Sequence, residues 1–132
     1  MRVYLAGPMT GLPAHNAPAF DAAERQLCDA GLDVVSPAAM LRLFPDDTLR
    51  QHFSRDCQAI CDADCVVLLD GWERSKGVAV ELALAGYLGI PVLEIDAIVH
   101  KNKLNIHVNV TKETSLISQS PRMLEVPHEQ EE

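Results

Sequence analysis

The chain has 132 residues and a mass of 14.5 kDa, which is enough for one compact domain and too little for two ordinary ones. With 48% hydrophobic and 23% charged residues, it has the composition of a soluble globular protein. Its 19 acidic and 11 basic side chains give a net charge of −8. This charge argues against a nucleic acid polymer or an anionic membrane as partner, because both require a basic face. A small anionic ligand remains compatible with it, because a few backbone N–H groups can bind a phosphate.

The first third of the chain alternates strand and helix patterns. Residues 3–6 are a short apolar run that ends at a Gly-Pro pair, which predicts a strand and a turn. The loop MTGLPAHNAP leads to residues 18–30, where apolar side chains recur at helical spacing and a glycine follows at the C-cap position. Residues 32–36 predict a second strand, which a proline stops, and residues 38–48 are expected to be irregular.

The alternation continues through the middle of the chain. Residues 49–63 predict a second main helix, and the continuous apolar run at 65–69 is typical of a strand covered on both faces. Residues 77–88 predict a third helix, which is apolar nearly all round and therefore expected to be buried on most sides. A fourth strand is expected at 91–95, and the alternating residues 106–110 could form a fifth strand at the edge.

Strands joined by helices predict an α/β protein with right-handed crossovers. The expected fold is a small doubly wound parallel sheet, flavodoxin-like or Rossmann-like, with four to five strands and helices on both faces. One domain is expected at residues 1–110. The tail at 111–132 is expected to be partly disordered or used in contacts between subunits.

No stretch approaches the ~18–20 apolar residues of a membrane span, and the N-terminus has no long apolar region typical of a signal peptide. A cytoplasmic protein is therefore expected. The cysteines, Cys28, Cys57, Cys61 and Cys65, form no CxxC pair. We expect them to be reduced, buried small hydrophobic residues rather than metal ligands.

Ligands of open parallel sheets bind at the carboxyl ends of the strands, where the strand order reverses. This rule selects the loops at 7–11 and 70–76. It also selects the first turns of the helix that follows the second of these loops. The 7–11 loop has neither a GxGxxG nor a P-loop pattern, but its backbone could bind an anion or a sugar. Asp70 occupies the position of the phosphoacceptor in response regulators. That interpretation fails, because Ala6, Gly7 and Pro8 stand where those proteins need an acidic pair.

Glu81 is the clearest anomaly in the sequence. Between residues 77 and 93 it is the only ionisable group apart from the phenol of Tyr87. The helix N-terminus would favour its ionised form, whereas apolar surroundings would raise its pKa. A poorly solvated carboxylate that faces a pocket suits a nucleophile; the alternative is a structural partner of an arginine or of backbone N–H groups.

Three further residues are candidates on weaker grounds. Asp56 lies on the helix that leads into the third strand, where a carboxylate is usually solvated. Tyr4 lies inside the first strand and either reaches the site or belongs to the core. Trp72, the single tryptophan, either stacks on a base or packs as a lid.

These residues occur in an order that resembles a known superfamily. The segments YLAGP, Arg-Asp before CDADCVVLL, S-x-G-x-x-x-E-L and G-x-P-V are similar to motifs of the nucleoside 2-deoxyribosyltransferase superfamily. YLAGPMTG and GWERSKG resemble its DUF4406 branch of small bacterial and phage proteins, which is similar to the 2′-deoxynucleoside 5′-monophosphate N-hydrolases. The resemblance covers residues 1–95.

The resemblance implies chemistry at an N-glycosidic bond without a metal or another cofactor. The family's nucleophile corresponds to Glu81, which would form a covalent ester with the sugar. The family's aspartate corresponds to Asp56, which would protonate the leaving base or orient the sugar. The family's tyrosine corresponds to Tyr4, which would hold the nucleophile or the sugar. A small nucleoside or nucleotide is the implied partner, and a homodimer or higher homo-oligomer is the implied assembly.

One position divides the family by substrate. Transferases of free nucleosides carry an aspartate six residues before the nucleophile, and hydrolases of 5′-monophosphates carry a serine, here Ser75. Ser75 and Lys76 therefore favour a phosphorylated substrate, although Ser75 could also serve as a helix N-cap. The first loop lacks the arginine of the nucleotide hydrolases. The residues expected to bind substrate are Gly7, Pro8, Met9, Gly11, Asp70, Trp72, Ser75 and Gly77.

Two functions remain compatible with the sequence. The first is an enzyme, an N-glycosidase or deoxyribosyltransferase with Glu81 as nucleophile. The alternative is a non-catalytic nucleotide-binding or sensing module on the same fold. The presence of both Glu81 and Asp56 favours the enzyme.

Overall fold

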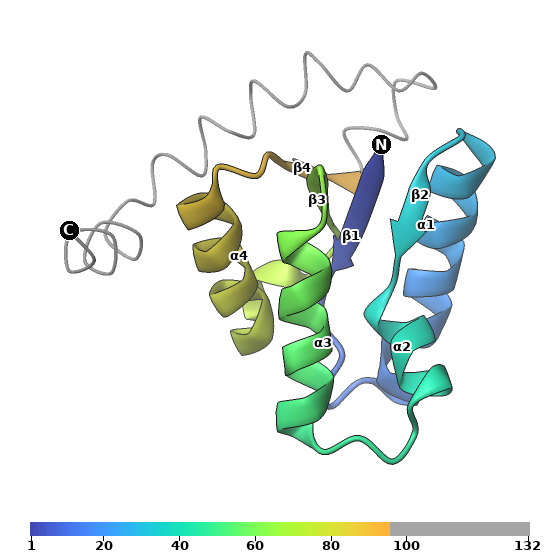
Figure 1. Ribbon diagram of the computed structural model, residues 1–132. Helices are drawn as coiled ribbons and strands as arrows, with labels where there is room; N and C mark the ends of the chain where they lie inside the picture. Colours follow the sequence, from blue (N-terminus) through green and yellow to red (C-terminus); the bar gives the residue numbers. More distant parts are fainter. Residues whose placement is uncertain (96–132) are drawn as a thin grey trace, which may run out of the picture.

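The computed structural model describes residues 1–95, and within them four parallel strands form one sheet (Figure 1). The strands lie in the order β2-β1-β3-β4. Their bounds are Arg2–Ala6 for β1, Asp33–Val35 for β2, Cys65–Leu68 for β3 and Val92–Glu94 for β4. The predicted α/β fold with a parallel sheet is confirmed. The possible strand at 106–110, the end of the domain at 110 and the tail at 111–132 lie outside the described residues.

Four α-helices and two short 3₁₀ turns connect the strands. The helices are α1 (Ala17–Asp29), α2 (Pro37–Leu43), α3 (Leu49–Cys61) and α4 (Lys76–Leu88), and the turns are η1 (Pro13–Asn16) and η2 (Trp72–Arg74). A capping box starts α3, because the side chains of Thr48 and Gln51 each accept a hydrogen bond from the other residue's backbone N–H. The left-handed Gly89 ends α4, as its sequence position predicts.

The helices cover the two faces of the sheet (Figure 1). Because side chains alternate along a strand, Val3 and Leu5 of β1 pack with residues of α1 on one face. Tyr4 and Ala6 lie in a second apolar cluster, which contains residues of α3 and α4. The alternation along β1 therefore places the Tyr4 side chain on the same face as the two helices that carry Asp56 and Glu81.

The strand order reverses between β1 and β3, so the loops that follow these strands lie next to each other. A Cβ atom on Gly7 would come within 2.8 Å of the Leu69 Cβ atom, and only a glycine allows this approach. On Gly71, which has a φ of 84°, a Cβ atom would lie 3.4 Å from Pro8 Cγ. The two loops predicted to flank a ligand are thus in contact.

Helix α2 corrects the prediction of an irregular segment at 38–48. Pro37 ends the preceding strand, as predicted, but it also occupies the start of the helix. A proline is favoured there because the missing N–H has no partner in the first turn of a helix. The prediction took account of only the first of these two properties.

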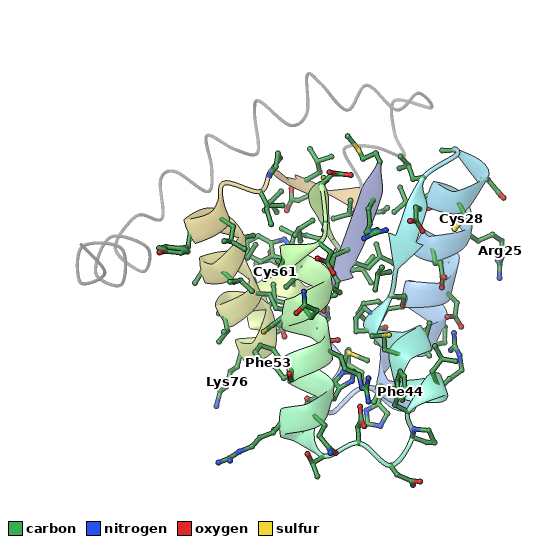
Figure 2. All side chains as sticks on the ribbon, viewed as in Figure 1. Arg25, Cys28, Phe44, Phe53, Cys61 and Lys76 are labelled. Carbon is green, nitrogen blue, oxygen red and sulfur yellow. The ribbon has the colours of Figure 1, made fainter. Side chains whose placement is uncertain are left out.

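The cysteine prediction is wrong for two of the four residues. Cys65 is buried and Cys57 is half-buried, but Cys28 and Cys61 are exposed, on α1 and α3 (Figure 2). All four carry free thiols. A helical period of four residues keeps side chains on one side of a helix, and it does not tell whether a neighbour covers that side.

The expectation that α4 is buried on most sides is also wrong. Its buried residues are Val78, Glu81 and Ala85, whereas Val80 and Leu88 are 51% and 44% exposed. The helix covers the sheet with one face only. Its one carboxyl group lies on that buried face, among apolar neighbours.

Candidate active site

Three polar side chains meet between the sheet and the helix pair α3–α4. The Tyr4 hydroxyl donates a hydrogen bond of 2.6 Å to Glu81 Oε2. Asp56 and Glu81 are only 4% and 6% exposed, and Tyr4 is fully buried. Asp56 lies close enough to both of the others to affect their titration. The structure therefore brings together the three residues that the sequence predicts to be catalytic.

Each of the three side chains comes from a different element. Tyr4 lies on β1, where it pairs with Val66 of the neighbouring strand. Asp56 lies on α3 one turn before the buried Ile60, and this spacing keeps both on the face toward the sheet. Glu81 lies between Val78 and Ala85 on the buried face of α4. The apolar packing of two helices on one sheet face thus fixes the position of the carboxyl pair.

Burial dominates the titration of the pair. It raises the pKa of Glu81 to about 8; the hydrogen bond from Tyr4 opposes this rise, and the nearby Asp56 adds to it. Burial likewise raises the pKa of Asp56 to about 7, with Tyr4 again opposing. Glu81 is the sixth residue of α4, and the field of a helix terminus falls off within the first turn. The desolvation of the carboxyl group therefore outweighs the helix terminus, so at neutral pH Glu81 is mostly protonated and Asp56 is partly protonated.

Tyr4 responds in the same direction. Its burial and the neighbouring Glu81 and Asp56 raise the pKa of its phenol well above the usual value of 10. The hydroxyl therefore stays protonated and acts as a hydrogen-bond donor. A buried donor aimed at Glu81 Oε2 favours the ionised form of that carboxyl group.

Sequence reasoning missed two residues at the site, His52 and Phe53. The Nε2 atom of His52 lies 3.3 Å from Asp56 Oδ2, one helical turn away. The ring of Phe53 lies close to the first turn of α4, and a Cβ atom on Gly77 would be 3.8 Å from its Cε1 (Figure 2). The spacing of four residues between His52 and Asp56 was the available signal.

The start of α4 combines a cap with free donors. The Ser75 side chain accepts a hydrogen bond of 3.2 Å from the Val78 backbone N–H, so its role as an N-cap is confirmed. Its hydroxyl hydrogen can still be donated to a ligand. Lys76 is exposed at the first helical position. A Cβ atom on Gly77 would be in ordinary contact distance of Ser75 Oγ, at 3.7 Å.

The loop after β1 is only partly accessible. Gly7 and Pro8 are buried, Met9 is half-buried and packs on the core, and Gly11 is exposed with a φ of 81°. The Asn16 side chain donates a hydrogen bond of 3.0 Å to the Pro8 carbonyl. The structure thus gives Gly7 and Pro8 a packing role, and their predicted contact with a substrate stays a prediction.

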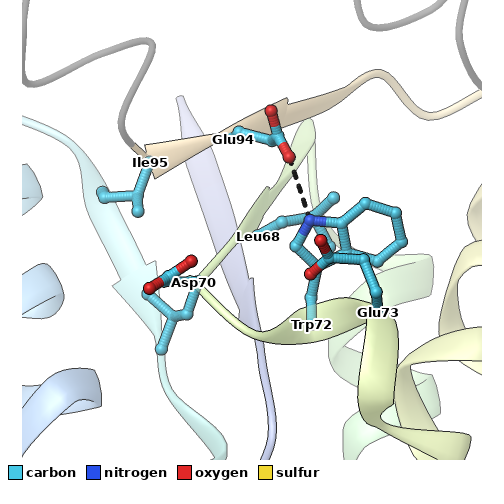
Figure 3. A pocket seen from close by; sticks show the side chains of 7 residues that line it. Leu68, Asp70, Trp72, Glu73, Glu94 and Ile95 are labelled. Atoms are coloured by element: carbon cyan, nitrogen blue, oxygen red, sulfur yellow. Dashed lines mark hydrogen bonds between the residues drawn. The ribbon is translucent and has the colours of Figure 1, made fainter.

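Asp70 and Trp72 line a hollow at the carboxyl ends of β3 and β4 (Figure 3). The Trp72 indole N–H donates a hydrogen bond of 3.0 Å to Glu94 Oε1, which holds the ring against the end of β4. The lining of this hollow includes neither Glu81 nor Asp56. The structure therefore does not bring Asp70 and Trp72 into the carboxyl cluster, and the stacking of Trp72 on a base stays a prediction.

Metal-ligand groupings and membrane-spanning helices are both absent from the described part of the chain. Within residues 1–95, no three His, Cys, Asp or Glu side chains are grouped so that they could hold a metal ion. None of the helices in the same range has the length and apolar character needed to cross a membrane.

Tyr4→Phe tests the link between β1 and the carboxyl pair. It removes the donor to Glu81 Oε2, and we expect a loss of roughly 1–2 kcal/mol in unfolding free energy, because a buried oxygen loses its partner. The pKa of Glu81 should also rise further, since the Tyr4 hydrogen bond opposes that rise. Urea unfolding and an NMR titration of the Glu81 carboxyl group measure the two effects. An unchanged Glu81 pKa would contradict the assigned hydrogen bond.

The structure resembles that of a characterised enzyme. The chain is similar to a 2-deoxyribosyltransferase from the psychrotolerant bacterium Bacillus psychrosaccharolyticus, described as a biocatalyst for the synthesis of antiviral and antitumoral nucleosides. The two share 26% sequence identity with a TM-score of 0.58, over 71% of each chain. A search of curated proteins finds no match.

The parallel sheet and the similarity to this enzyme thus define an α/β protein of the flavodoxin-like, 2-deoxyribosyltransferase-like class. Residues 1–94 match the family described as "Domain of unknown function (DUF4406)". The chain belongs to this family, and the resemblance to it is confirmed.

Proposed function

We propose that this protein breaks the N-glycosidic bond of a (deoxy)nucleoside or of its 5′-monophosphate and passes the sugar to water or to a second base. One observation carries the proposal: a buried Glu81 carboxyl group, held by the Tyr4 hydroxyl, lies beside the buried carboxyl group of Asp56. The similarity to a 2-deoxyribosyltransferase supports the same chemistry.

The reaction has two steps in this proposal. A carboxylate oxygen of Glu81 attacks C1′ of the sugar while the C1′–N bond breaks, and Asp56 gives its proton to the departing base nitrogen. Water or an acceptor base then attacks C1′ and returns a proton to Asp56, while the ester bond breaks and its electron pair returns to Glu81. Two displacements at C1′ retain the configuration of the sugar.

The protonation of the pair sets the pH dependence of this cycle. The productive form has Glu81 ionised and Asp56 protonated, and it competes with forms that hold both protons, neither proton, or the single proton on Glu81. With a pKa of about 8 for Glu81 and about 7 for Asp56, the single proton resides mostly on Glu81. The productive form is therefore a minor fraction, which reaches its maximum between these two values. It falls on the acid side as Glu81 gains a proton and on the alkaline side as Asp56 loses one.

The start of α4 supports a phosphorylated substrate. The hydroxyl of Ser75, the ammonium group of Lys76 and the free N–H groups of the first helical turn are all donors at one helix terminus. Such a terminus binds phosphate well because its donors and its dipole both favour an anion. An aspartate in place of Ser75 would repel a phosphate.

Base release tests the proposal directly. The protein is incubated with the common (deoxy)nucleosides and their 5′-monophosphates, with and without an acceptor base, and free base is measured by chromatography. We expect release from at least one substrate, faster from the monophosphate, and an intact-protein mass increased by one glycosyl group at early times. Binding of a nucleotide without release would instead support the non-catalytic binding module. If neither release nor binding occurs with any substrate, the proposed function is wrong.

A further inference from the structure

The two carboxyl oxygens of Asp56 have different surroundings. Oδ2 lies 3.3 Å from His52 Nε2. Oδ1 is buried and has no hydrogen-bond partner among the described residues. A buried polar oxygen without a partner costs free energy, so its presence beside a candidate nucleophile is itself an indication of function.

His52 is next to Asp56 on the same helix and shares its burial. The two residues are one turn apart on α3, and their side chains are 13% and 5% exposed. From outside α3, Asp47 and His15 face the imidazole, whereas Tyr4 and Glu81 face Asp56. Asp47 is itself held by the Arg55 guanidinium at 2.7 Å.

The imidazole is neutral under ordinary conditions. Burial lowers the pKa of His52; Asp47 opposes this change, and the neighbouring His15 adds to it. A neutral imidazole carries one N–H group. The Nε2 atom lies 3.3 Å from Asp56 Oδ2, just beyond the usual length of an N–H···O hydrogen bond.

We propose that His52 is a positioning residue for the catalytic acid: its Nε2–H donates to Asp56 Oδ2, so that the acidic proton of Asp56 resides on Oδ1, the oxygen without a partner. This inference rests on the proposed function only in taking Asp56 as the acid. The arrangement reserves Oδ1 for the base nitrogen of the substrate. It also fixes the orientation of the carboxyl group before the substrate binds.

The proton balance of the cycle is unchanged by His52. In the first step the Oδ1–H bond breaks and the proton goes to the base nitrogen, which leaves Asp56 as a carboxylate. The His52 N–H then stabilises the new charge through Oδ2. In the second step the attacking water or base returns a proton to Oδ1. His52 keeps its own proton throughout.

His52→Ala and His52→Gln form the decisive pair of variants. Alanine removes the donor, and glutamine replaces it with an amide N–H of similar reach that does not titrate. By NMR titration of the Asp56 carboxyl carbon, we expect alanine to raise the Asp56 pKa by about one unit, because the carboxylate loses a hydrogen bond. Glutamine should restore the wild-type value to within a few tenths of a unit.

The same pair gives a kinetic readout. The productive form peaks midway between the two pKa values, so a rise of about one unit in the pKa of Asp56 should move the pH optimum of base release up by about half a unit in His52→Ala. His52→Gln should return the optimum to the wild-type pH. A merely structural role would lower the rate without moving the pH optimum. Circular dichroism checks that both variants are folded. If His52→Ala does not fold, the shift is measured by comparing His52→Gln with His52→Leu.

The two proposals fail in distinguishable ways. An Asp56 pKa that is the same in the wild type and His52→Ala, or equal shifts in the alanine and glutamine variants, would overturn the role of His52 whether or not the protein turns over. An absence of base release in the wild type, with the Asp56 pKa still dependent on the donor at position 52, would overturn the proposed function and leave the positioning role intact.

Discussion

Glu81→Gln should lower base release by at least about 1,000-fold, because an amide cannot form the glycosyl ester. The substitution is nearly isosteric, and the amide oxygen can still accept the hydrogen bond that Tyr4 donates to Oε2 in the wild type. The fold should therefore be unchanged. The loss is measured by chromatography of the free base, and the glycosyl adduct should be absent from the intact-protein mass spectrum.

The matched control is Glu24→Gln on α1, a helix that packs on the opposite face of the sheet. It makes the same chemical change outside the cluster, and its activity should equal that of the wild type. Asp56→Asn separates the roles of the two carboxyl groups. It should slow the release of an ordinary base by roughly 10²–10⁴-fold and affect much less a substrate whose leaving group needs no proton. Wild-type activity in Glu81→Gln would exclude Glu81 as the nucleophile.

The order of elements was readable from sequence because the strongest local signals agree with the tertiary fold. Apolar runs ended by glycine or proline located β1 and β3 to within one residue. The rule that ligands bind where strand order reverses selected the loops after these strands, and the contact between Gly71 and Pro8 bears out their proximity. Helix α2 was missed because a proline that ends a strand can also begin a helix.

The carboxyl pair was predictable for a different reason. A single ionisable residue in the apolar α4 stands out from its neighbours, so Glu81 could be identified without coordinates. Asp56 offered no such contrast, because exposed charges surround it on α3, and it was selected through the family resemblance. His52 was missed since its significance depends on which face of α3 is buried, and that face is set by contacts with other elements.

The charge state of the pair could not be predicted from sequence. The helix terminus and the apolar surroundings act on Glu81 in opposite directions, and their balance depends on how much water reaches the carboxyl group. In the structure Glu81 is 6% exposed, which decides the balance in favour of burial. The exposure of one side of α4 could not be predicted either, because an apolar sequence does not show which side of a helix a neighbour covers. Val80 and Leu88 are apolar and lie on the exposed side.

Raising the pH from 6.5 to 8.5 should destabilise the wild-type protein by roughly 2–3 kcal/mol through the carboxyl pair. The folded-state pKa of Glu81 is about 8 against a reference of 4.5, and that of Asp56 is about 7 against 3.8. In this window the folded state holds protons that the unfolded state has already lost, so stability falls as pH rises through the folded-state values. His52, whose pKa is lowered, acts in the opposite direction below about pH 6.5, which is why the window starts there.

Calorimetric unfolding across this window measures the effect, and we expect the midpoint of the wild type to fall on the order of 10 °C. The double variant Glu81→Gln, Asp56→Asn cannot ionise at either position and should lose most of this slope, so that it is the more stable protein at pH 8.5. The double variant Glu24→Gln, Asp29→Asn removes two carboxylates from α1 and should keep the wild-type slope. Parallel slopes in the wild type and the first double variant would mean that water reaches both carboxyl groups, and a solvated Glu81 would lack the desolvation on which its proposed reactivity depends.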